Sequence, residues 1–299
     1  MEGVTKRYGA FTAVDDLSFS AARGQILGFL GPNGAGKTSS IRMMLGLMGP
    51  TAGRIEVLGA DDARKVRDRI GFLPEERGLY RRMTPVEAIA FLAGLKGVPR
   101  AEGRRRAREM LAAQGLSDAA DRQIRNLSKG MSQKVQLISA IAHEPELVIL
   151  DEPFSGLDPV NQQTLEGVIR GLAQRGATVL FSTHVMQHAE RLCDHVVLMA
   201  RGRKVFDGTV SQARSMAPRS LVVEGAFAAA AIADLPGVAD VHAEPAEEGR
   251  TQVTAALAPG AHGQEALKAA FGRGLDITRF EMHEPTLHDA FIVLTGEAA

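Results

Sequence analysis

The stretch Gly31-Pro32-Asn33-Gly34-Ala35-Gly36-Lys37-Thr38 decides the fold, because it matches the pattern G-x-x-x-x-G-K-[ST]. The run Gln25-Ile26-Leu27-Gly28-Phe29-Leu30 before it predicts a short buried strand, and residues 39–45 after it predict a helix. Glycines let backbone N–H groups turn inward around phosphate oxygens, and the helix N-terminus adds its positive dipole end. We therefore expect Lys37 to reach the β- and γ-phosphates of a nucleotide and the Thr38 hydroxyl to hold Mg²⁺. A chance Gly-rich turn is the alternative, and the strand–loop–helix context argues against it.

An acidic pair follows a second apolar run, Leu147-Val148-Ile149-Leu150-Asp151-Glu152. Four apolar residues predict a central strand of a parallel sheet. At the carboxyl end of such a strand, Asp151 is placed to hold Mg²⁺. Glu152 points elsewhere and can polarise a water molecule as a general base. Adjacent carboxylates are common on surfaces, but their position after this strand and downstream of the phosphate loop favours nucleotide hydrolysis.

Composition narrows the function classes. The chain has 299 residues, enough for one large domain and a small one, and its 35 basic residues balance 35 acidic ones. This balance argues against a general nucleic-acid binder, and we expect no nucleic-acid partner. The single cysteine, Cys193, excludes an internal disulfide. No signal peptide or long apolar run occurs, so we expect a cytoplasmic chain; if it serves transport, the membrane-spanning part must be a separate polypeptide.

Further motifs lie around these two segments. Leu127-Ser128-Lys129-Gly130-Met131 resembles the signature LSGGQ, and Ser155-Gly156-Leu157-Asp158 resembles a D-loop. Ser182-Thr183-His184 resembles a switch-histidine segment at the end of a predicted strand, and Tyr8 matches an aromatic position that stacks on adenine. In this order, over about residues 4–210, the motifs resemble the nucleotide-binding subunit of ABC transporters.

The resemblance implies an α/β fold: a P-loop NTPase domain of the ABC type over residues 1–216, with a helical subdomain at about residues 75–145. It also implies that two such domains, in a homodimer, pair head to tail around two ATP molecules. Each ATP then lies between the phosphate loop of one protomer and the signature of the other.

The roles that the resemblance implies fall into four groups. The ATP-binding residues are Tyr8, Gly31, Pro32, Asn33, Gly34, Ala35, Gly36, Lys37, Thr38 and Ser39. The catalytic residues are Glu152, His184, Lys37 and Glu75, and the Mg²⁺ ligands are Thr38, Asp151 and Glu75. The residues that act across the dimer are Ser128, Lys129, Gly130 and Met131 of the signature and Asp158 of the D-loop. His184 senses the γ-phosphate, and the signature precedes a helix that we expect to begin near Met131.

Three residues depart from the family pattern. Glu75 occupies the Q-loop glutamine position, and Lys129 and Met131 replace a glycine and the glutamine of the signature. Residues 73–80, Leu-Pro-Glu-Glu-Arg-Gly-Leu-Tyr, resemble a subgroup of ABC-2-type exporter ATPases that includes sodium and drug efflux systems. We therefore interpret Glu75 as a subgroup trait and expect an ABC-2-type permease as partner, docked near residues 75–82. The ATPase is then peripheral on the inner face of the cell membrane.

The sequence also predicts local features around this domain. Only five residues precede Lys6, so we expect a short first strand and a frayed sheet edge. Thr84, followed by Pro85 and Glu87, predicts a helix N-cap. The basic cluster Arg104-Arg105-Arg106 with Arg108 predicts a solvated helix face.

A composition shift after Met216-Ala217-Pro218 marks a second domain, residues 217–299. Its predicted order is strand 221–223, helix 227–233, strand 238–242, strand 251–257, helix 264–271 and strand 277–282. This β-α-β-β-α-β order indicates a small α+β, ferredoxin-like unit, followed by a helix over residues 286–294. Similar domains occur in the same exporter subgroup, and we expect a dimer-contact or regulatory role.

Two other function classes compete. A soluble ABC ATPase acting on DNA would need a long coiled-coil insertion between Lys37 and Leu127, and one acting on ribosomes carries two cassettes; neither is present. A P-loop kinase or switch GTPase is disfavoured by Glu152 beside Asp151 and by the absence of an N-K-x-D motif. The sequence therefore favours the ATPase of an exporter.

Overall fold

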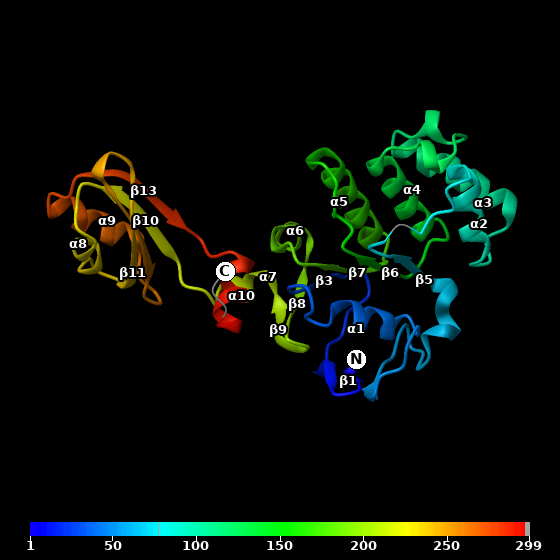
Figure 1. The fold of residues 1–299 in the computed structure, drawn as a ribbon, viewed down its shortest axis with the longest axis horizontal. Helices are drawn as coiled ribbons and strands as arrows, with labels where there is room; N and C mark the ends of the chain where they lie inside the picture. The colour runs from blue at the N-terminus through cyan, green and yellow to red at the C-terminus, as the bar shows by residue number, and fades with distance from the viewer. Residues whose placement is uncertain (77, 297–299) are drawn as a thin grey trace. The chain divides into compact units, whose positions relative to one another are not determined.

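The computed structural model describes residues 1–76 and 78–296 and divides into two compact units, Met1–Val210 and Ser211–Ala299 (Figure 1). The composition shift at Met216-Ala217-Pro218 lies a few residues inside the second unit. Each unit has its own buried apolar core.

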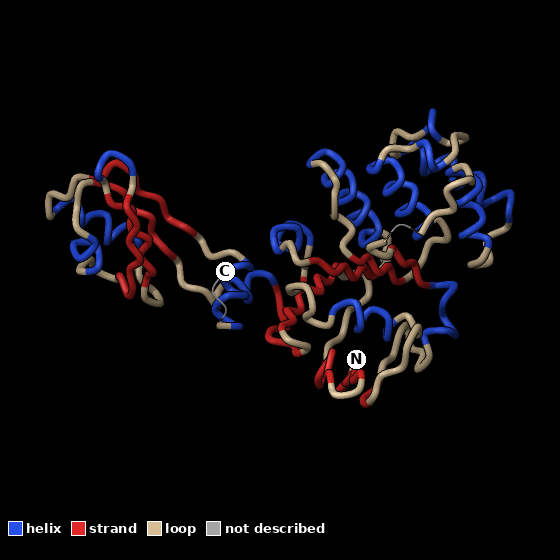
Figure 2. The backbone as a smooth tube through the Cα atoms, in the orientation of Figure 1, coloured by secondary structure: helices blue, strands red, loops and turns tan. Residues whose placement is uncertain are grey.

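A six-stranded sheet forms the centre of the first unit, in the order β5-β6-β7-β3-β8-β9. Its strands are β3 (Ile26–Leu30), β5 (Ile70–Leu73), β6 (Leu147–Asp151), β7 (Thr178–Thr183), β8 (His195–Ala200) and β9 (Arg203–Thr209). All neighbours pair in parallel except β8 and β9, which are antiparallel. Helices cover both faces, so β3 and β7 are buried throughout, as their continuous apolar runs predict (Figure 2).

A smaller antiparallel sheet has the order β2-β1-β4, with β1 and β2 before the phosphate loop in the chain and β4 after it. Its strands are β1 (Glu2–Tyr8), β2 (Phe11–Leu17) and β4 (Ala52–Arg54). Strand β1 pairs with β4 at Glu2 and Thr5 and with β2 from Val4 to Tyr8, and Met1 exchanges backbone hydrogen bonds with Phe19. The expectation of a frayed first strand is therefore wrong, because β2 and β4 cover both of its edges.

The helices of the first unit include α1 (Lys37–Met44), α5 (Pro159–Gln174) and α6 (Met186–Leu192), with α7 (Val210–Arg214) at the boundary. Helices α2 (Pro85–Gly94), α3 (Arg100–Ala113) and α4 (Lys129–Ile141) pack around a separate apolar core and form the helical subdomain. The Thr84 hydroxyl accepts from the Glu87 N–H while the Glu87 carboxylate accepts from the Thr84 N–H. This reciprocal pair confirms the predicted cap of α2.

The helix after the signature begins earlier than expected. It starts at Lys129, not near Met131, because Ser128 is its N-cap and accepts a hydrogen bond from the Met131 N–H at 3.2 Å. Serine is a strong N-cap because its hydroxyl satisfies one of the first unpaired N–H groups.

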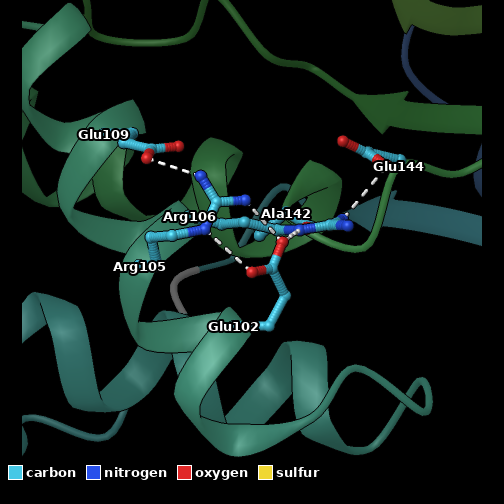
Figure 3. Close-up of polar contacts among 6 residues, drawn as sticks. All are labelled: Glu102, Arg105, Arg106, Glu109, Ala142 and Glu144. Atoms are coloured by element: carbon cyan, nitrogen blue, oxygen red, sulfur yellow. Dashed lines mark hydrogen bonds and ion pairs between the residues drawn. The ribbon is translucent and has the colours of Figure 1, made fainter.

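The C-terminal end of α4 is tied to α3 by a network of charged side chains (Figure 3). Arg106 donates to the Ala142 carbonyl at 3.2 Å and to Glu102 at 2.6 Å, and it pairs with Glu144 at 3.1 Å. The neighbouring Arg105 instead bridges Glu102 and Glu109 on the helix surface. The predicted solvated face is therefore wrong for Arg106, whose side chain is only 24% exposed.

The second unit is a four-stranded antiparallel sheet in the order β11-β12-β10-β13. Its elements are β10 (Ser220–Gly225), α8 (Ala229–Ala233), β11 (Val238–Pro245), β12 (Thr251–Leu257), α9 (Gly263–Gly272), β13 (Ile277–His283) and α10 (Leu287–Thr295). This element order and strand order confirm the ferredoxin-like prediction. Thr286 and Asp289 form a capping box at the start of α10.

Across the two described ranges, 1–76 and 78–296, no helix combines the length and apolar character needed to cross a membrane.

Candidate functional site

The phosphate loop joins the buried end of β3 to α1. Gly31 has φ 153° and Gly36 has φ 97°, and a Cβ atom on either would lie 2.2 Å and 2.5 Å, respectively, from a backbone oxygen. These two positions therefore require glycine, both for backbone conformation and for the close approach of Met199 and Ala13. The loop is fixed on a rigid strand and opens onto the first turn of α1, where unpaired N–H groups suit an anion.

Lys37 lies within this loop and is almost fully buried. Its ammonium group donates to the Gly31 carbonyl at 2.6 Å and to the Pro32 carbonyl at 3.1 Å. Burial lowers the pKa of Lys37, while the carboxylates of Glu152, Asp151 and Glu75 oppose that shift. The phosphate loop thus holds the Lys37 ammonium group near the carboxylates of Glu75, Asp151 and Glu152.

Asp151 is the last residue of β6 and is buried. The Ser182 hydroxyl on the adjacent strand β7 donates to its Oδ1 atom. Burial raises the pKa of Asp151, and the Ser182 hydrogen bond partly offsets this. The strand pairing that sets Asp151 opposite Ser182 therefore fixes the direction of the carboxylate.

Glu152 follows in a backbone conformation that L-residues rarely adopt, with φ 46°. Its side chain is 10% exposed, and both carboxylate oxygens accept hydrogen bonds. Oε2 accepts from the Thr183 hydroxyl at 3.0 Å, and Oε1 accepts from the His184 N–H at 3.0 Å. The Nδ1 atom of His184 lies 2.8 Å from the same Oε1. The segment after β7 thus orients the carboxylate that the sequence indicates as a general base.

One pocket of about 210 Å³ brings the predicted residues together. It is lined by Pro32, Asn33, Gly34, Ala35, Gly36, Lys37, Thr38, Ser39, Glu75, Asp151 and Glu152, with Phe11 and Ala13 in addition. Residues of the phosphate loop, the Lys37 cation and three carboxylates therefore line one space. Such an arrangement can hold a nucleotide triphosphate and a divalent cation.

The pocket is lined by an aromatic residue that sequence reasoning missed. Phe11 lies beside the phosphate loop and is 65% exposed, whereas Tyr8 is not among the residues that line this pocket. Tyr8 is its partner across the β1–β2 hairpin and is 46% exposed, with its hydroxyl 3.1 Å from the Met48 sulfur. The signal for Phe11 was its place three residues after Tyr8, where a tight turn returns the chain.

The residues expected to act across a dimer lie on the surface of the first unit. Ser128, Lys129, Gly130 and Met131 form the N-cap and first turn of α4, and none of them lines the phosphate-loop pocket. Asp158 is the N-cap of α5 and accepts from the Asn161 N–H at 2.9 Å. The hydrogen bonds from Asn161 lower the pKa of Asp158.

Glu75 is exposed just after β5 and lines the phosphate-loop pocket. Its neighbours Pro74 and Glu76 belong to the segment 73–80 that resembles exporter ATPases, of which Arg77 lies outside the described residues.

Comparison with known proteins agrees with this geometry. The family model described as "ABC transporter" matches residues 14–155, and that of the "ATP-binding protein DrrA1-3-like, C-terminal domain" matches residues 208–295. An uncharacterized ABC transporter ATP-binding protein, YhaQ of Bacillus subtilis, is 37% identical over 99% of this chain and 98% of its own length. The linearmycin resistance ATP-binding protein LnrL of the same organism is 31% identical over 99% of this chain and 97% of its own.

Two further matches extend the comparison. The Nod factor export ATP-binding protein I of Ralstonia nicotianae is 39% identical over 70% of this chain and 66% of its own length. A solved structure of the ATP binding subunit of an ABC transporter superposes with a TM-score of 0.67 at 34% identity, covering 72% of this chain and 90% of that one.

Proposed function

Because this chain belongs to the family of ABC transporter ATP-binding proteins, we propose a residue-level mechanism for it and a specific kind of membrane partner. The family assignment makes the chain an ATP-hydrolysing subunit of an exporter, and in this proposal it dimerises around two ATP molecules and drives a separate permease. The relatives named above are transporter proteins, and none acts on ribosomes or DNA by its name.

Binding of ATP falls to the phosphate loop in this proposal. Backbone N–H groups of Gly31 and of residues 33–39 hold the phosphates, and the Lys37 ammonium group neutralises their charge. Tyr8 and Phe11 stand on the hairpin at the side of the loop, where an aromatic ring can stack on adenine.

The donor set in the pocket fits Mg²⁺. The Thr38 hydroxyl and the carboxylates of Asp151 and Glu75 line one space, and hard oxygen donors are those that Mg²⁺ prefers. The hydrogen bond from the Ser182 hydroxyl fixes the orientation of the Asp151 carboxylate. Bound Mg²⁺ supplies charge neutralisation between the phosphates, and the protein supplies its position.

Glu152 carries the proposed hydrolytic step as general base. The observation that supports it most directly is the complete orientation of its carboxylate by Thr183 and His184, next to the phosphate-loop pocket. An oriented carboxylate can accept the proton of an attacking water molecule, and such bases contribute about 10²–10⁴-fold to the rate. Ser128, Lys129, Gly130 and Met131 would meet the ATP bound by the partner subunit, and Asp158 would communicate across the dimer.

The Glu152→Gln variant tests this assignment. It should lose hydrolysis by at least about 100-fold while retaining ATP affinity, because the amide keeps the shape but cannot take a proton. Glu146→Gln is a matched control, since Glu146 pairs with Arg69 and Arg23 away from the pocket. Wild-type turnover in Glu152→Gln would remove Glu152 from the proposed role.

We further propose that the partner is an ABC-2-type permease and that the working ATPase is a homodimer on the cytoplasmic face of the membrane. The likeness to the Nod factor export and linearmycin resistance proteins supports an exporter of this kind. The second unit, which matches the DrrA1-3-like C-terminal domain model, would serve dimer contact or regulation in this proposal.

A pull-down identifies the partner. Tagged Glu152→Gln protein, purified from mild-detergent membranes with MgATP, should retain a multi-span membrane protein that is identified by mass spectrometry. Recovery of ribosomal proteins or nucleic acid without a membrane protein would reject the proposed partner.

A further inference from the structure

Two glutamines on α4 contact the two active-site loops of their own protomer. Gln133 and Gln136 are three residues apart, so their side chains lie on the same face of the helix. Neither residue belongs to the signature segment 127–131 or lines the phosphate-loop pocket.

Gln136 is buried at 7% exposure and holds the loop that carries Glu75. Its amide nitrogen donates to the Glu76 carbonyl at 3.1 Å and to the Pro74 carbonyl at 3.4 Å. The two acceptors flank Glu75 on either side, so one side chain fixes the backbone from which that carboxylate projects.

Gln133 makes the corresponding contact to the other loop. Its amide nitrogen donates to the Pro153 carbonyl at 2.6 Å, one residue after Glu152. Since Glu152 sits at φ 46°, a fixed peptide on its C-terminal side helps to hold that unfavourable conformation.

Helix α4 is itself fixed at both ends. Ser128 caps its first turn, and Arg106 donates to the Ala142 carbonyl at its last turn (Figure 3). The next residue, His143, contacts the Ile70 carbonyl at the start of β5 at 3.1 Å. Because both of its ends are fixed, α4 can hold the two loops at a constant position.

The space between the loops is a pocket of about 390 Å³. Its lining includes both glutamines, Lys129 and the carboxylates of Glu75, Asp151 and Glu152. The glutamines thus stand on one wall of a cleft whose other walls carry the acids.

We propose that Gln133 and Gln136 are positioning residues. Their hydrogen bonds hold both loops against α4 and so fix the distance between the carboxylates of Glu152 and Glu75. Gln136 acts through Glu75, and Gln133 acts through Glu152. This inference rests on the roles proposed above for Glu75 and Glu152.

Methionine variants test the two glutamines, because methionine keeps the side-chain length and removes the amide donor. Gln136→Met and Gln133→Met should each lower kcat by about 10- to 100-fold, since misplacement of a catalytic group by about 1 Å costs up to about 100-fold. The KM for ATP should change by less than about twofold, because the phosphate loop is untouched. Gln174→Met is the matched control, an exposed glutamine at the end of α5.

The two variants are told apart by their dependence on Mg²⁺. Gln136→Met should raise the Mg²⁺ concentration that gives half-maximal activity, because Glu75 is a proposed ligand. Gln133→Met should lower kcat without that shift. The Gln136→Met change is also made in a Glu75→Gln background, where the Glu75 carboxylate that Gln136 positions is absent. In that background it should change the Mg²⁺ dependence of ATP binding by less than about twofold.

Two results would overturn the inference. One is activity within about twofold of Gln174→Met for both variants. The other is an equal effect of Gln136→Met with and without the Glu75→Gln change, together with a lowered Tm, which would indicate a purely structural role. Wild-type turnover in Glu152→Gln would instead reject the proposed function and is measured independently.

Discussion

The Nδ1 atom of His184 lies 2.8 Å from Oε1 of Glu152, and the backbone N–H of His184 donates to the same oxygen at 3.0 Å. His184 therefore contacts the predicted general base directly, through both its ring and its backbone. The family resemblance implies a different contact for His184, with the γ-phosphate.

This contact distinguishes substitutions of His184. An asparagine amide can replace the Nδ1 contact, whereas a glutamine amide reaches the position of Nε2. We expect His184→Ala to lower kcat by about 100-fold, and His184→Asn to retain more activity than His184→Gln. Steady-state ATPase rates of the three variants provide the measurement. Higher activity in His184→Gln would show instead that Nε2 carries the function.

Lys37→Ala should lower ATP affinity by at least about tenfold, because a charge-assisted contact to the phosphates is lost. Titration with a fluorescent ATP analogue measures this. Lys65→Ala is the control, since Lys65 forms an exposed pair with Asp61 on the surface. Unchanged affinity in Lys37→Ala would reject the phosphate-loop assignment.

Arg106 and Arg105 are adjacent but should differ in their effect on stability. Arg106→Met removes a side chain that joins α3 to the Ala142 carbonyl and Glu144, so we expect Tm to fall by about 2–4 °C. Arg105→Met removes pairs on the surface of α3 alone and should leave Tm almost unchanged. Differential scanning calorimetry of the two variants compares them, and an equal loss would show that the tie to Ala142 contributes nothing.

His143 should make the fold sensitive to mild acid. Burial and the charge of Lys96 lower the pKa of His143 to about 4, from 6.5. The unfolded chain therefore binds a proton at higher pH than the folded chain, so stability falls as pH drops from about 6.5 to about 4. Replacement of His143 by glutamine removes this contribution to the pH dependence of stability. Thermal unfolding of wild type and His143→Gln across that pH range should show a shallower pH dependence in the variant, and parallel curves would contradict the prediction.

Much of the fold follows from local sequence signals. The buried strands and the phosphate loop were predicted because apolar runs and the G-x-x-x-x-G-K-[ST] spacing act over short distances. The cap at Thr84 and the ferredoxin-like order of the second unit also follow from local patterns, and the structure confirms both.

What the sequence could not predict depends on contacts between distant segments. The start of α4 is a local exception, because the Ser128 cap that sets it at Lys129 spans only three residues and is a signal within the sequence itself. The contacts of Gln133 and Gln136 join residues about 20 and 60 positions apart, and no local pattern encodes them. The direct contact of His184 with Glu152 likewise depends on β6 and β7 being neighbours in the sheet.

The position of β3 also determines when this protein acquires its nucleotide site during synthesis. Strand β3, which carries the phosphate loop, lies between β7 and β8 in the sheet, and both of these strands are made much later. Chains fold from the N-terminus as they leave the ribosome, and pairings this distant in sequence form slowly. The nascent chain must therefore keep Ile26–Leu30 without a partner strand in this sheet until Thr178–Thr183 has emerged, so ATP binding is a late event in its biogenesis.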